Sequence, residues 1–575
     1  MEPTPSPLPG GELSKRAHEF VRDPSVIRAI LVSFALALLI QVHPQESGVP
    51  EQRSTPERAS AAVRVFVKDV KFVKAEKSEG KTVFSPEELT AVISSYLGRE
   101  VTSVELEEAR RALTLHYVNA GYVNSGAQLP DQDVSDGIVT FEIIEGALSE
   151  ITIRGNQRLR SGYIRNRILR GAGEPLNLGT LRDPLLQLRQ NPNIRDISAR
   201  LRRGDALGEG KLEVRVEEAI PYRIETQVRN DRSPSVGAEL LELIAAHENL
   251  TGNSDLLQMR YGVVKRDRDG AKFPGLDNIG AGYTLPITSH NTSASLYFDQ
   301  SDESVIEEPF DFLNIESQTR SYAFGLRHPL LKNFYEEIAV GLTADYRSSE
   351  TFLLGEPFSF SHGAVDGKSV ISALRLSGEW IRRGSVQVLA SRLTLGWGLD
   401  VLDATRNENG PDGQFVSVLG QVQYLRRLWH EAAQEELRQG QLILSGSFQW
   451  TGDPLLPLER LRLGGAHTVR GYRENQLLRD KGILATAEYR LPVLISRNQN
   501  ILQVSPFIDF GIGWNSEERI SGPREIASAG IGLIYTPNNR VRARLDWGYP
   551  FRDLKSSTKD AQDLGLHFSV SVRWF

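Results

Sequence analysis

The last three-fifths of the chain alternates between apolar and polar side chains, and this period constrains the fold more than any other feature. In residues 322–327, Tyr, Phe and Leu alternate with Ala, Gly and Arg, and residues 541–549 and 564–574 show the same pattern with Trp and Tyr on the apolar side. Successive side chains of a β-strand point to opposite faces, so each stretch has one apolar face and one polar face.

This alternation predicts an all-β transmembrane barrel over residues 219–575. A soluble sandwich does not bury small and charged residues while it exposes Trp and Tyr, whereas a membrane barrel places its apolar face in lipid and its polar face in a wet lumen. Sixteen antiparallel strands leave about 22 residues for each strand and connection, and a spanning strand needs about 9–11. Fourteen or eighteen strands fit the same length.

The N-terminus predicts export. Residues 29–40 are apolar apart from Ser33, are too short to span a bilayer, and follow Arg22 and Arg28. We therefore predict that residues 1–43 are a signal or export segment. Residues 44–61 are polar with scattered prolines and form a linker. The chain has no cysteine, which excludes disulfides, thiolate nucleophiles and Cys-ligated metals and suits passage through an oxidising compartment.

Two similar α+β units are expected between the linker and the barrel. The first, residues 62–146, has a strand over Val63 to Val73, helices that begin at capping signals near Ser85 and Ser103, and a closing strand at 138–144. The second, residues 147–218, repeats the order more briefly. Both therefore predict a β-α-α-β-β fold, and tandem units of this kind are the main organisational signal of the first half.

The sequence contains no recognisable catalytic constellation. It has no HExxH, GxSxG or phosphate-loop motif, and its ten histidines are dispersed. We therefore expect no enzymatic activity, no metal and no cofactor. A net charge of −6 and a pI near 6.0 also argue against nucleic acid as a partner.

One cluster of polar and glycine residues stands apart from the barrel pattern. A long connection near residues 453–481 separates two predicted strands, and a later strand carries Phe, Asp and Gly at alternate positions. The connection contains Gly464, Gly465, Val469, Arg470, Gly471 and Tyr472, and the strand contains Phe507, Asp509 and Gly511.

With these motifs, VRGY and FxDxG, residues 62–575 resemble the two-partner secretion transporters (TpsB) of the BamA-like POTRA–barrel superfamily. The resemblance is strengthened by the two N-terminal units, which match POTRA domains, and by the C-terminal Phe575. It implies a bacterial outer-membrane pore with its POTRA domains in the periplasm. It also implies that the VRGY loop folds back into the lumen, where Arg470 pairs with Asp509 on the barrel wall.

The resemblance further implies the partners. The POTRA domains receive an unfolded exoprotein, which adds its extended segments to a strand edge of the first domain. Outer-membrane lipid surrounds the barrel, and the barrel-assembly machinery inserts it with Phe575 as a signal, although Phe575 is one residue out of register with the apolar set. The expected docking edge comprises Tyr122, Val123, Asn124, Ser125, Gly126 and Ala127.

Other interpretations remain open at this stage. Arg470 can be one lumen arginine among many, with glycines that merely allow a turn. The chain can be an assembly factor that inserts other barrels, although two POTRA units count against it, or less favourably a passive porin or adhesin. The polar segment after residue 43 is too short to assign a plug helix.

Overall fold

The computed structural model describes residues 64–75, 82–264, 278–308, 310–428, 440–496, 499–516, 522–554 and 559–575. The described chain divides into two compact units, residues 64–219 and residues 220–575. The expected export segment 1–43 and the linker 44–61 lie outside the described residues.

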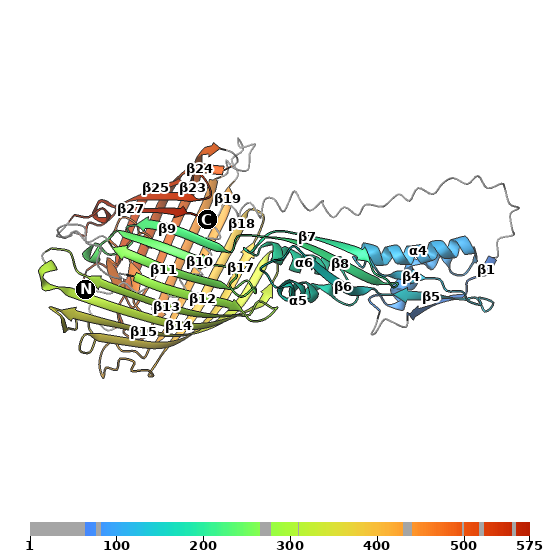
Figure 1. Ribbon diagram of the computed structural model, residues 1–575, viewed down its shortest axis with the longest axis horizontal. Helices are drawn as coiled ribbons and strands as arrows, with labels where there is room; N and C mark the ends of the chain where they lie inside the picture. The colour runs from blue at the N-terminus through green and yellow to red at the C-terminus, as the bar shows by residue number, and fades with distance from the viewer. Residues whose placement is uncertain are drawn as a thin grey trace. The chain divides into compact units, whose positions relative to one another are not determined.

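The N-terminal unit begins with a β-α-α-β-β fold that carries two additional short strands (Figure 1). Its elements are β1 (Arg64–Phe66), β2 (Asp69–Lys74), α3 (Pro86–Val92), the 3₁₀ turn η1 (Ser94–Tyr96), β3 (Glu100–Thr102), α4 (Ser103–Asn119), β4 (Gly126–Gln128) and β5 (Ile138–Ile144). In the main sheet β5 is central, parallel to β2 and antiparallel to β4. The single strand expected over Val63 to Val73 is wrong, because β1 pairs with β3 and β2 pairs with β5.

Reciprocal capping boxes start both helices of this fold. At α3 the Ser85 hydroxyl accepts from the Glu88 amide, and the Glu88 carboxylate accepts from the Ser85 amide, as the capping signal predicts. At α4 the cap is Thr102 rather than the expected Ser103, since Thr102 is the residue with extended backbone before the first turn. The Thr102 amide, which donates to the Glu105 carboxylate, holds the pKa of Glu105 at about 2.

The same order of elements follows immediately. It consists of β6 (Ala147–Arg154), α5 (Ser161–Ala172), α6 (Leu178–Arg189), β7 (Ile194–Arg203) and β8 (Glu209–Glu218). Here β8 is central, parallel to β6 and antiparallel to β7, which lies at the edge. Each fold has its own buried core. In the second fold, Ile164 and Ile168 of α5 pack against Leu212 and Val214 of β8.

In the described part of the chain, no helix has both the length and the apolar character needed to cross a membrane.

Residues 220–575 form a closed antiparallel barrel (Figure 1). Its strands are β9 (Tyr222–Arg229), β10 (Leu240–His247), β11 (Leu256–Val264), β12 (Asn278–Pro286), β13 (Ser293–Ser304), β14 (Ile315–Lys332), β15 (Glu336–Leu353), β17 (Lys368–Arg383), β18 (Gln387–Leu399), β19 (Val416–Leu428), β20 (Gly440–Thr451), β23 (Lys481–Ser496), β24 (Gln499–Trp514), β25 (Glu525–Tyr535), β26 (Val541–Pro550) and β27 (Leu566–Arg573). A two-residue strand, β16 (Glu356–Pro357), pairs only with the end of β15. Within the described residues sixteen strands therefore complete the ring, which confirms the expected number.

The ring closes where the first and last strands meet. Residues 225–229 of β9 pair antiparallel with residues 569–573 of β27, so this seam has five register pairs. By contrast β14 and β15 pair over almost their full length of 18 residues. The seam differs from the other pairs because β9 and β27 are the first and last strands of the barrel sequence, so no connection between consecutive strands holds them together.

The two faces of the strands differ as the alternation requires. Large apolar side chains such as Tyr322, Phe324 and Trp547 are 45–48% exposed on the outside, where a bilayer covers them. Charged side chains on alternate positions, such as Asp345 and Arg347 of β15, are buried on the inside. The polar face therefore lines the interior of the barrel, where buried charges such as Asp345 and Arg347 pair with one another.

Residues 452–480, which connect β20 to β23, fold against the inner, polar face of the barrel wall. They contain a small two-stranded sheet, β21 (Leu461–Leu463) with β22 (Leu477–Arg479), and the turn between these strands carries the VRGY sequence. We call residues 452–480 the lumenal loop. Leu463, Val469 and Tyr472 of this loop are buried with Ile526 of the barrel wall.

Candidate functional site

Arg470 and Asp509 form a buried, bidentate ion pair at the tip of the lumenal loop. The Arg470 Nε donates to Asp509 Oδ2 at 2.7 Å and Nη2 donates to Oδ1 at 2.9 Å. The backbone amide of Arg470 adds a third bond to Oδ2 at 3.1 Å. Both residues are at most 4% exposed. Three directional bonds on one carboxylate fix the tip against β24 in a single pose.

The other two residues of the FxDxG motif support this pair from the same face of β24. The Arg470 guanidinium carbon lies 3.4 Å from the centroid of the Phe507 ring, which is cation–π distance. Gly511 leaves space for the loop, since a Cβ there would lie 3.0 Å from Leu463 and 3.1 Å from Val469. The aromatic ring and the carboxylate thus both bind the Arg470 guanidinium, and the absent side chain of Gly511 makes room for the neighbouring loop residues.

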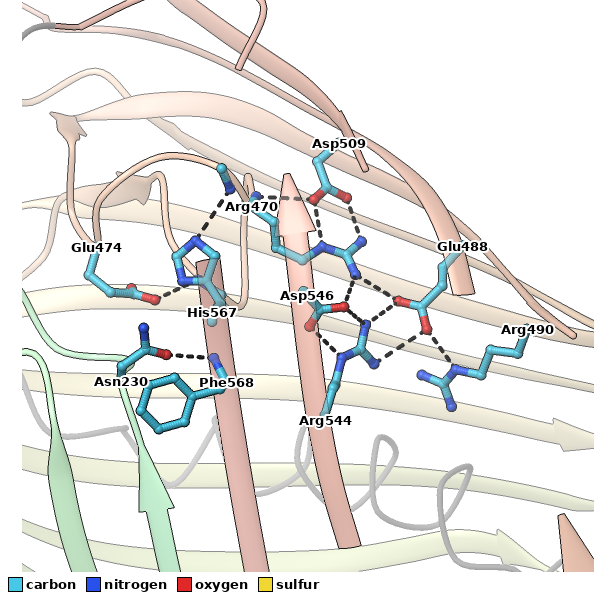
Figure 2. A network of polar contacts seen from close by, with 12 residues as sticks. Asn230, Arg470, Glu474, Glu488, Arg490, Asp509, Arg544, Asp546, His567 and Phe568 are labelled. Carbon is cyan, nitrogen blue, oxygen red and sulfur yellow. Dashed lines mark hydrogen bonds and ion pairs between the residues drawn. The ribbon is translucent and has the colours of Figure 1, made fainter. Parts of the chain in front are cut away.

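Four further charged residues extend the pair into a network that the motifs alone did not indicate (Figure 2). Glu488 of β23 accepts from Arg470 Nη1 at 2.9 Å, and it also accepts from Arg544 Nη2 at 2.9 Å and from Arg490 Nε at 2.6 Å. Asp546 of β26 accepts from Arg544 Nε at 2.6 Å. Three arginines therefore face the carboxylates of Asp509, Glu488 and Asp546, so the network is balanced in charge. Its only signal in the sequence is the inward position of each residue in the alternation.

The residues that follow Arg470 lie against the last strands of the barrel. The Gly471 amide donates to His567 Nε2 at 3.3 Å, and Gly471 has a φ of 91°. A Cβ on Gly471 would lie 2.7 Å from the carbonyl oxygen of Gly548, so two glycines permit this backbone contact. The Tyr472 hydroxyl donates to the Ala527 carbonyl at 3.0 Å and accepts from the Arg552 amide at 3.2 Å.

Gly464 and Gly465 form the turn that leads into the tip. Their φ angles of 105° and 111° are in the region that favours glycine. A side chain at Gly465 would overlap the carboxylate of Glu474, which folds back to accept from the Ala466 amide at 2.5 Å. The structure thus brings all six motif residues of the loop and all three motif residues of β24 into one buried site.

The predicted docking edge is only partly a strand. Tyr122 to Ser125 form the turn after α4, where the Ser125 amide donates to the Tyr122 carbonyl. In β4 the Ala127 amide donates to Thr114 Oγ1 and its carbonyl accepts from Arg110 Nη1. The expectation of a strand edge from Tyr122 to Ala127 is therefore corrected: the strand is Gly126–Gln128, and α4 already binds its outward-facing backbone groups.

At the C-terminus β27 ends at Arg573, so Phe575 lies beyond the last strand. Phe575 packs edge-on against Tyr222 of β9 with ring centroids 6.2 Å apart. The amide of the preceding Trp574 donates to the Ile224 carbonyl, and its indole donates to the Thr226 hydroxyl.

In the described residues no group of three or more His, Asp or Glu side chains is arranged to hold a metal ion.

Comparisons with known proteins find similarity to bacterial transporters. The chain resembles the heme/hemopexin transporter protein HuxB of Haemophilus influenzae, with 22% identity over 476 residues that cover 78% of this chain and 77% of HuxB. It is also 22% identical over 420 residues to the outer membrane transporter CdiB of Dickeya dadantii, covering 72% of each. The CdiB structure from Escherichia coli superposes with a TM-score of 0.66 at 17% identity over the whole of both chains.

A more distant fold likeness joins the chain to BamA from Haemophilus ducreyi, with a TM-score of 0.51 at 13% identity, 88% of this chain and all of that one being covered. Matches to family models assign the chain to a family more specifically than these structural similarities do. Residues 73–146 match the ShlB-type POTRA domain, which is periplasmic in these outer-membrane transporters. Residues 208–535, more than half of the chain, match the haemolysin secretion/activation protein ShlB/FhaC/HecB. The chain therefore belongs to the ShlB/FhaC/HecB family and is an outer-membrane transporter of two-partner secretion.

Proposed function

We propose that this transporter captures one unfolded exoprotein in the periplasm and passes it through the barrel, past the lumenal loop, to fold outside the cell. The observation that carries the proposal is the buried Arg470–Asp509 pair, which ties a loop inside a closed barrel to the wall by directional bonds. A pore that must hold back solutes yet release a chain requires an obstruction that is fixed in one pose and can be detached.

The exoprotein binds, in this proposal, at the edge of β7 instead of the edge of β4. We assign residues 147–218 as a second POTRA domain on the grounds that they repeat the order and pairing of the first fold. β7 is ten residues long and pairs with β8 on one side only, whereas β4 has three residues. A longer edge offers more backbone bonds to an extended segment.

The remaining partners follow from the barrel itself. The apolar outer face contacts outer-membrane lipid, and the barrel-assembly machinery inserts the chain by recognising Phe575, which is exposed just beyond β27. The proposal includes no catalytic step and no cofactor. Direction comes from folding of the exoprotein outside, which removes it from the pore.

The experiment that tests this function is quantitative proteomics of the medium and of the outer-membrane fraction, from cells with and without the chain. We expect one or two large proteins to disappear from the medium while the outer-membrane composition stays constant. Broad loss of barrel proteins from the membrane would instead establish an assembly factor. Unchanged medium and membrane, with altered solute permeability alone, would establish a passive porin.

A further inference from the structure

The part of the lumenal loop that precedes the VRGY tip is bound to a different stretch of the barrel wall. Leu455, Leu456 and Leu458 are at most 4% exposed and pack with Ile371 and Ala373 of β17. Burial of three leucines holds this segment close to the wall, but apolar contacts do not fix its register along the strand. The fixing contacts come from the next residue.

Glu459 joins a compact cluster of charges on β15 and β17. Its Oε1 accepts from Arg375 Nη2 at 2.6 Å and forms an ion pair with Arg347. Asp345 accepts from Arg375 Nε at 2.6 Å and from Arg347 Nε at 3.1 Å, and Arg347 also donates to the Leu458 carbonyl at 2.9 Å. All four side chains are at most 13% exposed. Two arginines thus face two carboxylates, one of which belongs to the loop.

The two attachments of the loop are on separate stretches of the ring. The cluster around Glu459 is on β15 and β17, and the tip contacts β23 and β24 and, through Asp546 at 3.6 Å, β26. In the order of the sixteen strands, β17 and β23 are four positions apart, and β15 and β26 are eight positions apart. The loop is therefore fixed to two separate parts of the barrel wall by independent groups of ion pairs.

We propose that Glu459, with Arg347 and Arg375, forms a second latch that holds the base of the lumenal loop across the pore, and that closure requires both this latch and the one at Arg470. The inference rests on the proposed function. Glu459 acts as a positioning residue: it sets where the loop lies. Removal of one member of a buried charge cluster leaves the others uncompensated, so neutralising Glu459 leaves two arginines facing one aspartate and releases the base.

The test measures single-channel currents of purified full-length variants in planar lipid bilayers. We expect Glu459→Gln to spend at least about tenfold more time open than the wild type, a factor equivalent to about 1.4 kcal/mol. Glu459→Asp keeps the charge and is expected to close nearly normally. The double variant Arg347→Gln with Glu459→Gln restores the charge balance but still lacks the ion pairs to the loop, so it is expected to open about as often as Glu459→Gln.

Glu379→Gln is the matched control. Glu379 is an inward glutamate on β17, 6% exposed, whose ion pair with Arg327 at 2.8 Å does not involve the loop. We expect it to conduct like the wild type. Each variant is first checked for a folded barrel by its heat-modifiable migration on gels; if Glu459→Gln fails to fold, Glu459→Asp and the double variant carry the comparison.

The outcomes separate the latch from the underlying function. An open Arg470→Ala channel with a wild-type Glu459→Gln channel overturns the second latch and leaves the proposed function intact. If Glu379→Gln opens as often as Glu459→Gln, the second latch is also overturned, since the loss of any ion pair inside the barrel would then be enough to open the channel. If folded Arg470→Ala and Glu459→Gln both conduct like the wild type, the lumenal loop is not an obstruction and the proposed function itself fails.

Discussion

At the scale of single residues, the tip of the lumenal loop depends on guanidinium geometry and not on positive charge alone. Arg470 donates to both oxygens of Asp509, reaches Glu488 with its remaining nitrogen and stacks on Phe507. A lysine ammonium is a compact point charge that cannot make these contacts together. A substitution that keeps the positive charge at position 470 therefore still loses the contacts that hold the loop tip.

We expect Arg470→Lys to be nearly as defective as Arg470→Ala. Both leave the barrel in the membrane, because the strand ladder does not include Arg470, and both lower secretion at least about tenfold, since the loss of one member of a buried pair exceeds the 1.4 kcal/mol that this factor needs. The measurement is the amount of exoprotein in the medium relative to the amount of transporter in the membrane. Normal secretion by Arg470→Ala would show that attachment of the lumenal loop to the barrel wall is not needed for secretion.

Backbone contact at Gly548 gives a second prediction at this scale. A Cβ on Gly548 would lie 2.7 Å from the Gly471 amide nitrogen, so Gly548→Ala pushes the tip away from β26. We expect this variant to open more often than the wild type in bilayer recordings. The control is Gly378→Ala, a barrel-strand glycine whose Cβ would meet nothing within 4 Å; equal currents from both variants would contradict the close contact.

At the scale of elements, alternation and capping signals predicted most of what the structure contains. They indicated the barrel strands and the β-α-α-β-β order of both N-terminal folds, whereas the length of the chain allowed fourteen, sixteen or eighteen strands. They failed where tertiary pairing decides: residues 63–73 divide between two sheets, and the turn at 122–125 is not a strand. Only the hydrogen bonds of Ala127, which accepts from Arg110 and donates to Thr114, show that the edge of β4 is already occupied.

The free edge of β7 carries the prediction for exoprotein binding. A photo-crosslinking amino acid at Ser198 or Arg200, both exposed on β7, is expected to capture the exoprotein in cells that secrete it. The same probe at Arg182, exposed on α6 of the same fold, is expected to capture none, because augmentation occurs at strand edges. The measurement is the shifted band on an immunoblot, and capture at Arg182 alone would exclude β7 as the binding edge.

At the scale of the whole molecule, the site depends on residues that the pairing of the barrel strands and the position of the loop bring together. The motifs VRGY and FxDxG could be found in the sequence because each is local. Glu488, Arg544 and Glu459 could not, since the contacts that join them to Arg470, Glu488 and Arg347 span 18 to 112 residues and are specified by register across strands. Many lumen positions carry arginine or glutamate, so composition does not show which of them bind the loop.

Closure of the ring supplies the last prediction. Gln562, which is 0% exposed, donates to the carbonyls of Asn230 and Arg232 beyond β9, and it accepts from the Glu474 amide of the lumenal loop. Asn230 in turn accepts from the Phe568 amide at 2.6 Å (Figure 2). These side chains extend a seam of only five register pairs and connect it to the loop.

Gln562→Ala leaves two carbonyls and one amide buried without these partners, and each such group costs about 1–3 kcal/mol. We therefore expect the folded barrel to lose its heat-modifiable gel mobility at a lower temperature than the wild type. Gln421→Ala, on β19 and far from the seam in the ring order, is the control and is expected to unfold like the wild type. If the two variants unfold at the same temperature, the five register pairs hold the barrel closed by themselves and Gln562 serves only the loop.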